Sequence, residues 1–150
     1  MKRALKVDPD FCPSPVRDSD ELFPNGIFVF NITRMLEYLQ ASSSCVEPTE
    51  ITVEELPSGF STTDESAISL ANLDRPVVLA EIAPGQYNLI DGHHRAEKAR
   101  RVGVTKLKAY KVSAEQHVAF LTSEKAYLTY VEYWNGKVKE LKRRGKLNHK

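Results

Sequence analysis

Residues 89–95, Leu89-Ile90-Asp91-Gly92-His93-His94-Arg95, join the end of an expected strand to the start of an expected helix. Gly92 has no Cβ, so the main chain can approach a ligand closely at this point. The helix that follows presents N–H groups in its first turn and a partial positive charge at that end. Such a helix start is suited to hold a phosphate. The stretch therefore predicts a phosphate-binding turn.

The side chains around Gly92 supply groups for phosphate chemistry. Arg95, which we expect to be partly exposed, lies in the first helical turn and is placed for a bidentate contact with phosphate, and Lys98 follows one turn later. His93 and His94 are suited to hydrogen-bond phosphate or to act as acid or base near neutral pH. Asp91 is suited to cap the helix, bind a phosphate-linked metal or take a proton. The candidate catalytic residues are Asp91 and His93, and the candidate phosphate or nucleotide ligands are Gly92, His93, His94, Arg95 and Lys98.

The same residues also suit a purely structural turn, in which Gly92 only reverses the chain and Asp91 only caps the helix. A structural metal site is not expected. Neighbouring helical side chains project about 100° apart, so His93 and His94 do not converge on one ion, and His117 is expected on a helix surface.

The flanking sequence predicts the elements on either side of the turn. Residues 77–90 are β-rich and broken by Pro84-Gly85, which predicts a hairpin. A helical stretch runs from the turn to Val102, with Gly103 as a left-handed C-cap. Residues 106–112 alternate polar and apolar side chains, as a half-buried strand does. We therefore expect strand, strand, helix and strand over 77–112, with the helix beginning within two residues of Gly92.

The remaining sequence is less regular. Residues 1–26 are rich in proline and acid and predict an extended arm with short strands and a turn at Pro24-Asn25-Gly26. Asn31 is suited to cap a helix that ends near Ala41. Over residues 49–75 the sequence predicts only a strand near Ile51, a polar loop over 59–66 and either a short helix or a short strand over 67–73. Ser113 and Gln116 fit a capping box. The spacing of apolar residues after Tyr127 predicts a helix that Asn135-Gly136 interrupts. We expect the chain to form a single domain over residues 1–141, followed by a basic tail over 142–150, and we find no internal repeat in the sequence.

Length and composition agree with an ordinary globular protein. The chain has 150 residues, 41% hydrophobic and 27% charged, and a net charge of +1, so bulk charge does not favour a general nucleic-acid binder. Basic residues concentrate locally in 95–111 and 137–150. Cys12 and Cys45 form no metal-ligand pair and are expected to be reduced thiols. No apolar run is long enough to cross a bilayer, and we expect a cytoplasmic protein without membrane contact.

Residues 76–121 resemble the N-terminal domain of ParB proteins, in which a strand leads into a Gly-x-x-Arg turn, a helix with small residues, a glycine and another strand. The matching residues are Leu89 to Arg100, then Gly103 and the basic strand. The resemblance implies an α+β fold of the ParB/sulfiredoxin type, a small mixed sheet with flanking helices. Its members include partitioning ParB proteins, sulfiredoxins and free-serine kinases. All three bind a nucleotide or its phosphates at this turn, so ATP, ADP or CTP with Mg²⁺ is the implied cofactor.

Departures from these members narrow the expected activity. Sulfiredoxins carry a reactive cysteine where this chain has His93, and too few residues follow 121 for the DNA-reading and dimerisation domains of partitioning proteins. Free-serine kinases share the Asp-Gly-His start, which implies an NTP-dependent small-molecule phosphotransferase or an NTPase. The base remains open among Glu81, Asp18 and Glu65. One alternative is a ParB-like nucleic-acid-binding protein or nuclease, which would bind DNA weakly through the basic cluster over 95–111 and the basic tail. The other is a noncatalytic module that binds a nucleotide or a partner protein. The partner surface considered for it consists of Tyr127, Tyr130, Tyr133 and Trp134.

Overall fold

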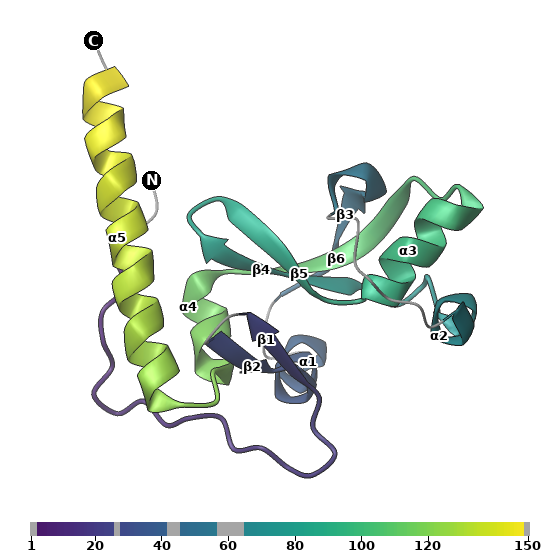
Figure 1. Cartoon of the computed structure of the whole chain (residues 1–150), viewed down its shortest axis with the longest axis horizontal. Coiled ribbons are helices and arrows are strands. Elements are labelled where there is room, and N and C mark those ends of the chain that lie inside the picture. Colours follow the sequence, from purple (N-terminus) through teal and green to yellow (C-terminus); the bar gives the residue numbers. More distant parts are fainter. Residues whose placement is uncertain (1–2, 26–27, 42–45, 57–64, 149–150) are drawn as a thin grey trace.

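The computed structural model describes residues 3–25, 28–41, 46–56 and 65–148. It has the expected α+β class, with a small mixed sheet and flanking helices (Figure 1). The elements in chain order are β1 (Leu22–Asn25), β2 (Phe28–Asn31), α1 (Ile32–Gln40), β3 (Thr49–Thr52), the 3-10 turn η2 (Val53–Glu55), α2 (Glu65–Leu70), β4 (Val77–Ala83), β5 (Gln86–Asp91), α3 (His93–Val102), β6 (Lys106–Val112), α4 (Ala114–His117), the 3-10 turn η3 (Val118–Phe120) and α5 (Glu124–Asn148).

The larger sheet has four strands in the order β3-β6-β4-β5. β4 pairs antiparallel with β5 and parallel with β6, whereas β3 pairs antiparallel with β6. A parallel pair requires a crossover connection, and here β5 and α3 provide it. β1 and β2 form a separate antiparallel pair.

Strand β4 is buried on both faces, since all seven of its residues are buried. Val77 and Leu79 pack in one cluster with Ala96 and Ala99 of α3, whose small side chains let the helix lie close to the sheet. The alternate residues of β4 belong to a second cluster on the other face, with side chains from α1, α4 and α5. The first cluster holds the end of β5 and the start of α3 in place.

The structure confirms the expected order of strand, strand, helix and strand over 77–112. Helix α3 begins directly after Gly92, and Gly103 ends it in the left-handed conformation with φ +80°. Asn31 caps α1 through its side-chain oxygen, which accepts from the Arg34 N–H at 3.0 Å. Gln116 accepts from the Ser113 N–H at 3.0 Å, as the capping box predicts. The segment left undecided over 67–73 contains the end of α2.

Helix α5 differs from the prediction, because it continues through Asn135-Gly136 to Asn148 without the expected break. It therefore also continues through residue 142, where the expected basic tail begins. Tyr127, Tyr130 and Trp134 are buried in the core, whereas Tyr133 is 37% exposed. Most of the aromatic surface suggested for a partner protein thus stabilises the fold. Predictions for Gly26, Cys45 and residues 59–64 fall outside the described residues.

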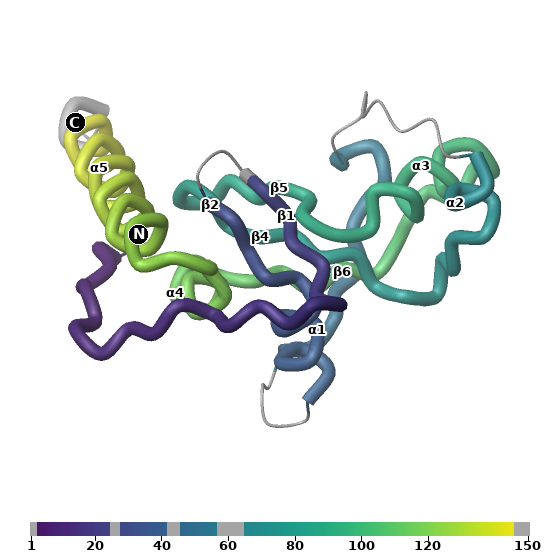
Figure 2. Tube along the Cα trace, turned by 60° about the horizontal axis from the view of Figure 1, so that its bottom comes forward, coloured from purple at the N-terminus to yellow at the C-terminus, as the bar shows by residue number. Residues whose placement is uncertain are grey.

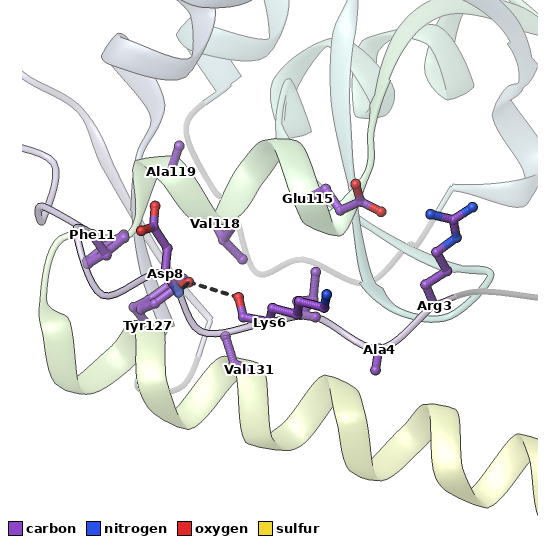
Figure 3. A pocket seen from close by; sticks show the side chains of 11 residues that line it. Arg3, Ala4, Lys6, Asp8, Phe11, Glu115, Val118, Ala119, Tyr127 and Val131 are labelled. Atoms are coloured by element: carbon purple, nitrogen blue, oxygen red, sulfur yellow. Dashed lines mark hydrogen bonds between the residues drawn. The ribbon is translucent and has the colours of Figure 1, made fainter.

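The start of the expected extended arm lies along α5, and the arm then runs on to β1 (Figures 1 and 2). The Asn135 side chain pairs with both main-chain groups of Leu5, at 2.7 and 2.9 Å, and the Trp134 indole donates to the Arg3 carbonyl at 2.8 Å. The Tyr127 hydroxyl accepts from the Asp8 N–H at 2.8 Å. A groove of about 460 Å³ remains between this arm and α4 (Figure 3). Asn135 therefore does not end the helix. Its side-chain amide instead forms hydrogen bonds with the main chain of the arm at Leu5.

His117 is fully buried, so the expected surface position is wrong. Its Nε2 lies 2.7 Å from the Glu81 carbonyl and donates to it, and Phe30 and Tyr130 pack edge-on against the ring. Burial lowers the pKa of His117 to about 4. The short helix α4 therefore turns this residue inward against β4, which helical spacing alone did not indicate.

Stability is expected to fall as the pH is lowered from 7 to 5, in part because of His117. The unfolded residue titrates near 6.5 and the folded one near 4, so the unfolded state takes up a proton that the folded state does not. Its contribution is complete above the unfolded pKa, begins to be lost below it, and reaches about 2 kcal/mol of loss by pH 5. Denaturant melts of wild type and His117→Gln at both pH values check this, since the variant should lose less. Identical pH dependence would contradict it.

None of the helices in the described ranges combines the length and apolarity needed to cross a membrane.

Candidate functional site

A polar pocket of about 360 Å³ lies where β1, α2, the loop before β4 and the start of α3 meet. It contains most of the turn that the sequence singled out. The lining side chains and main-chain segments come from Glu21, Phe23, Ala67, Leu70, Ala71, Asn72, Arg75, Ile90, Asp91, Gly92, His93, His94 and Arg95. The structure thus brings Asp91, Gly92, both histidines and Arg95 to one cavity, and leaves Lys98 outside its lining.

Gly92 is the N-cap of α3 and has φ +101° and ψ +23°, in the left-handed region that favours glycine. A Cβ at this position would lie 2.5 Å from Val77 Cγ1 and 2.9 Å from Val77 Cβ. Since Gly92 lacks a side chain, α3 has no side-chain cap at this residue. The glycine is therefore required by the backbone conformation and by packing against β4, whether or not a ligand is bound.

Arg95 has a structural task that the sequence did not reveal. Its guanidinium donates to the carbonyls of Arg75 and Pro76 at 3.3 and 2.9 Å, and to the Asp91 carboxylate at 3.1 Å. The Arg95 and Asp91 side chains are each only 12% exposed. This group therefore ties the start of α3 to the loop before β4, and much of its hydrogen-bonding capacity is used within the protein.

The other cations of α3 also hold neighbouring segments. Lys98 donates to the carbonyls of Ser69 and Ala71, at 2.8 and 2.9 Å, and so satisfies the end of α2. Arg100 donates to the Leu56 carbonyl at 2.6 Å. Arg101 pairs with Glu97 of its own helix and with Glu65 of α2. Lys98 therefore stabilises the C-terminal end of α2. The expected contact of its side chain with phosphate would require these two hydrogen bonds to break.

Arg75 lines the pocket with a guanidinium group that is available to bind a ligand. Its side chain is exposed at the pocket, and it makes no hydrogen bond or ion pair with the described part of the chain. The turn that presents Arg75 is closed by its own N–H, which donates to the Asn72 carbonyl at 3.2 Å. The hydrogen bonds from Arg95 to the carbonyls of Arg75 and Pro76 also stabilise this turn. Arg75 was missed because it lies in sequence far from the motif, in a loop with no pattern of its own.

His93 and His94 both line the pocket, and the His93 ring stacks on Phe23 of β1, with ring centroids 5.6 Å apart. Burial lowers the pKa of His93, an effect that the negative charge of Asp91 partly offsets. His93 is therefore neutral near pH 7. Its ring joins β1 to the start of α3 and is suited to exchange a hydrogen bond with a ligand rather than to supply a charge.

Glu21 is a second residue that sequence reasoning missed. It stands just before β1 and faces the pocket that Asp91 also lines. Desolvation raises the pKa of Glu21, and the negative charge of Asp91 raises it further, against the opposing effects of Arg95 and His94. A carboxyl group with a raised pKa beside a second carboxylate is suited to accept a proton.

The three carboxylates considered as bases from the sequence do not line this pocket. Glu81 is 1% exposed, and its carboxylate accepts from the Gly85 N–H at 2.8 Å in the β4–β5 turn. Glu65 pairs with Arg101 on the surface. Asp18 lies in the arm and is exposed. The acidic residue of the arm that does line the pocket is Glu21, directly before β1.

Within the described ranges, no group of three or more His, Cys, Asp or Glu side chains is arranged to hold a metal ion. Two carboxylates, Glu21 and Asp91, nevertheless line the same pocket. Mg²⁺ is commonly held by one or two protein carboxylates together with substrate phosphates and water. The donor set thus suits a magnesium ion that arrives with a phosphate ligand, rather than a resident metal.

Comparison with protein-family models gave no match, and neither did comparison with curated protein sequences.

Proposed function

We propose that this protein binds a nucleotide with Mg²⁺ in the pocket at the start of α3, in a ParB/sulfiredoxin-like fold, and catalyses phosphoryl transfer to a small acceptor or to water. The observation that carries the proposal is the meeting of opposite charges in one cavity. Arg75 and the start of α3 line the same pocket as the carboxylates of Glu21 and Asp91. Phosphoryl transfer requires mainly positioning and charge neutralisation, and this pocket supplies groups for both.

In the proposed complex, the phosphate groups lie against the main-chain N–H groups in the first turn of α3. Arg75 and His94 contact the phosphate oxygens. Asp91 keeps its contact with Arg95 and would hold a magnesium ion that neutralises charge on the phosphates, whereas Glu21 stays uncoordinated. Glu21, whose pKa is raised, accepts the proton of the attacking hydroxyl or water. ATP, ADP and CTP are the nucleotides to compare.

Arg75→Ala is expected to weaken nucleotide binding by about tenfold or more, because a hydrogen bond to a charged group typically contributes about 1.5–3 kcal/mol. The melting temperature without ligand should change little, since the Arg75 side chain is exposed and has no partner among the described residues. Titration calorimetry with ATP, ADP and CTP, each with and without magnesium, measures the affinity.

The matched control for Arg75 is Lys108→Ala, which removes one exposed cation from β6, away from the pocket. Because both variants lower the net charge by one, any loss of affinity that they share reflects the overall charge of the protein and not the pocket. Equal affinity of Arg75→Ala and wild type, or equal losses in Arg75→Ala and Lys108→Ala, would argue against this pocket.

Glu21→Gln separates an enzyme from a noncatalytic nucleotide-binding module. If Glu21 accepts the proton, the variant should still bind nucleotide but release phosphate much more slowly. Unchanged turnover would remove Glu21 from the mechanism, and wild-type protein that binds nucleotide without any turnover would favour the noncatalytic module.

A further inference from the structure

The last part of α5 extends past the core of the protein. Among the α5 side chains that the structure describes, which end at residue 145, the last buried one is Val138, yet the helix continues to Asn148. At about 1.5 Å per residue, the segment beyond Val138 is about 15 Å long. Figure 1 shows this end of α5 rising away from the sheet and the other helices. Side chains of this segment therefore contribute to something other than packing of the core.

The charge of the segment is strongly one-sided. Residues 137–146 contain six Lys or Arg residues and a single acidic residue, Glu140. The whole chain has a net charge of only +1, so the rest of the protein is net acidic. The described positions are Lys137, Lys139, Lys142, Arg143 and Arg144, and Arg144 pairs with Glu140 at 3.1 Å. The protein thus has a basic end, which the near-neutral total conceals.

Three of these cations share one exposed face of the helix. Lys139 lies three residues before Lys142 and four before Arg143, the spacings that place side chains side by side. All three are exposed, and none forms a hydrogen bond or ion pair with the described part of the chain. Like charges at this spacing destabilise a helix. Cations do stabilise a helix C-terminus, but that effect is confined to the last turn, and Lys139 and Arg143 precede the last turn.

We propose that this basic face of α5 binds the phosphate backbone of duplex DNA. An α-helix fits the major groove of B-form DNA, whereas the major groove of A-form RNA is too deep and narrow to admit one. Contacts made by Lys and Arg to phosphates position a protein but do not read sequence. Binding is therefore weak, sensitive to salt and indifferent to base sequence.

An anionic membrane fits this surface less well. Helices that lie in a membrane interface bury an apolar face in the lipid, but the apolar face of α5, which includes Tyr130, Trp134 and Val138, is already buried in the core. The other basic cluster, on α3, is also less suitable for DNA. Lys98, Arg100 and Arg101 are bonded to neighbouring segments of the protein.

The test is fluorescence anisotropy of a labelled 20-base-pair DNA duplex of mixed sequence with the full-length protein. Phosphate contacts by these three cations predict that affinity falls about 40-fold between 50 and 200 mM salt. Lys139→Gln/Arg143→Gln should weaken binding at 50 mM salt by at least tenfold and reduce the slope of log affinity against log salt by about two. A shuffled duplex should bind equally well.

The matched control is Lys106→Gln/Lys108→Gln, which removes the same charge from exposed positions on β6 and should bind as wild type does. Three outcomes would overturn the proposal. They are absence of binding at 50 mM salt, equal loss in both double variants, and tighter binding to duplex RNA or phosphatidylserine vesicles than to duplex DNA. Because neither double variant alters the α3 pocket, nucleotide binding is measured independently, and its failure would leave this result unaffected.

Discussion

Gly92→Ala is expected to destabilise the protein by about 3 kcal/mol in the absence of any ligand. A non-glycine residue in the left-handed region costs about 1–2 kcal/mol, and Gly92 has φ +101°. The added Cβ would also lie 2.5 Å from Val77 Cγ1, and relief of such a contact in a packed core typically costs about 1–3 kcal/mol. Chemical denaturation without nucleotide measures the change.

Two other glycines separate the conformational cost from the steric cost. Gly85 and Gly103 have φ +74° and +80°, and a Cβ at either position would meet no atom within 4 Å. Alanine at each should therefore cost about 1 kcal/mol, for conformation alone. Val77→Ala in the Gly92→Ala background should recover part of the loss, because it removes the nearest atom. If Gly92→Ala cost no more than Gly103→Ala, the contact with Val77 would be unimportant.

This result has a consequence for ligand binding. A loss of nucleotide affinity in a Gly92 variant does not by itself place phosphate at the turn, because the glycine is needed for the fold. The larger Gly92→Val change makes the steric problem worse. Arg75, which lines the same pocket but supports no neighbouring segment, gives a cleaner test of binding.

Arg95→Ala is expected to cost about 3 kcal/mol of stability, in contrast to the small effect expected of an exposed residue. The change removes hydrogen bonds to two carbonyls and leaves the Asp91 carboxylate, 12% exposed, without its cation. Removal of one partner from a largely buried ion pair typically costs about 3–5 kcal/mol, and the remaining exposure places the expectation at the lower limit. Denaturant melts without ligand measure the loss.

Arg95→Lys and Arg75→Ala are the informative comparisons. Lysine retains the charge but lacks the planar fork that reaches Pro76 and Asp91 together, so Arg95→Lys should lie between wild type and Arg95→Ala. Arg75→Ala should change stability by no more than about 0.5 kcal/mol. A stability loss in Arg95→Ala as small as that in Arg75→Ala would show that the contacts of Arg95 do not hold the loop before β4.

Local sequence was sufficient for the elements around the turn. Strand alternation in β6, Pro84-Gly85 between β4 and β5, and the glycines at both ends of α3 each act within a few residues. Asn31 and Ser113 were identified as caps for the same reason, since a cap bonds to N–H groups two or three residues away. The α+β class, which was expected from the resemblance to ParB domains, agrees with this order of elements. The position of the candidate pocket followed as well, because the pocket forms around the turn itself.

Tertiary structure decided which side chains are available to a ligand. Arg95 and Lys98 have the spacing of phosphate ligands, but α3 packs beside the loop before β4 and the end of α2, and these segments present carbonyls that bond to both cations. Glu21 and Arg75 reach the pocket from two separate segments, both of which precede the motif in sequence. Asn135 continues a helix because a distant arm pairs with its amide, and His117 is buried because α4 packs on β4. Each of these outcomes depends on partners far apart in the chain, and local periodicity carries no information about such partners.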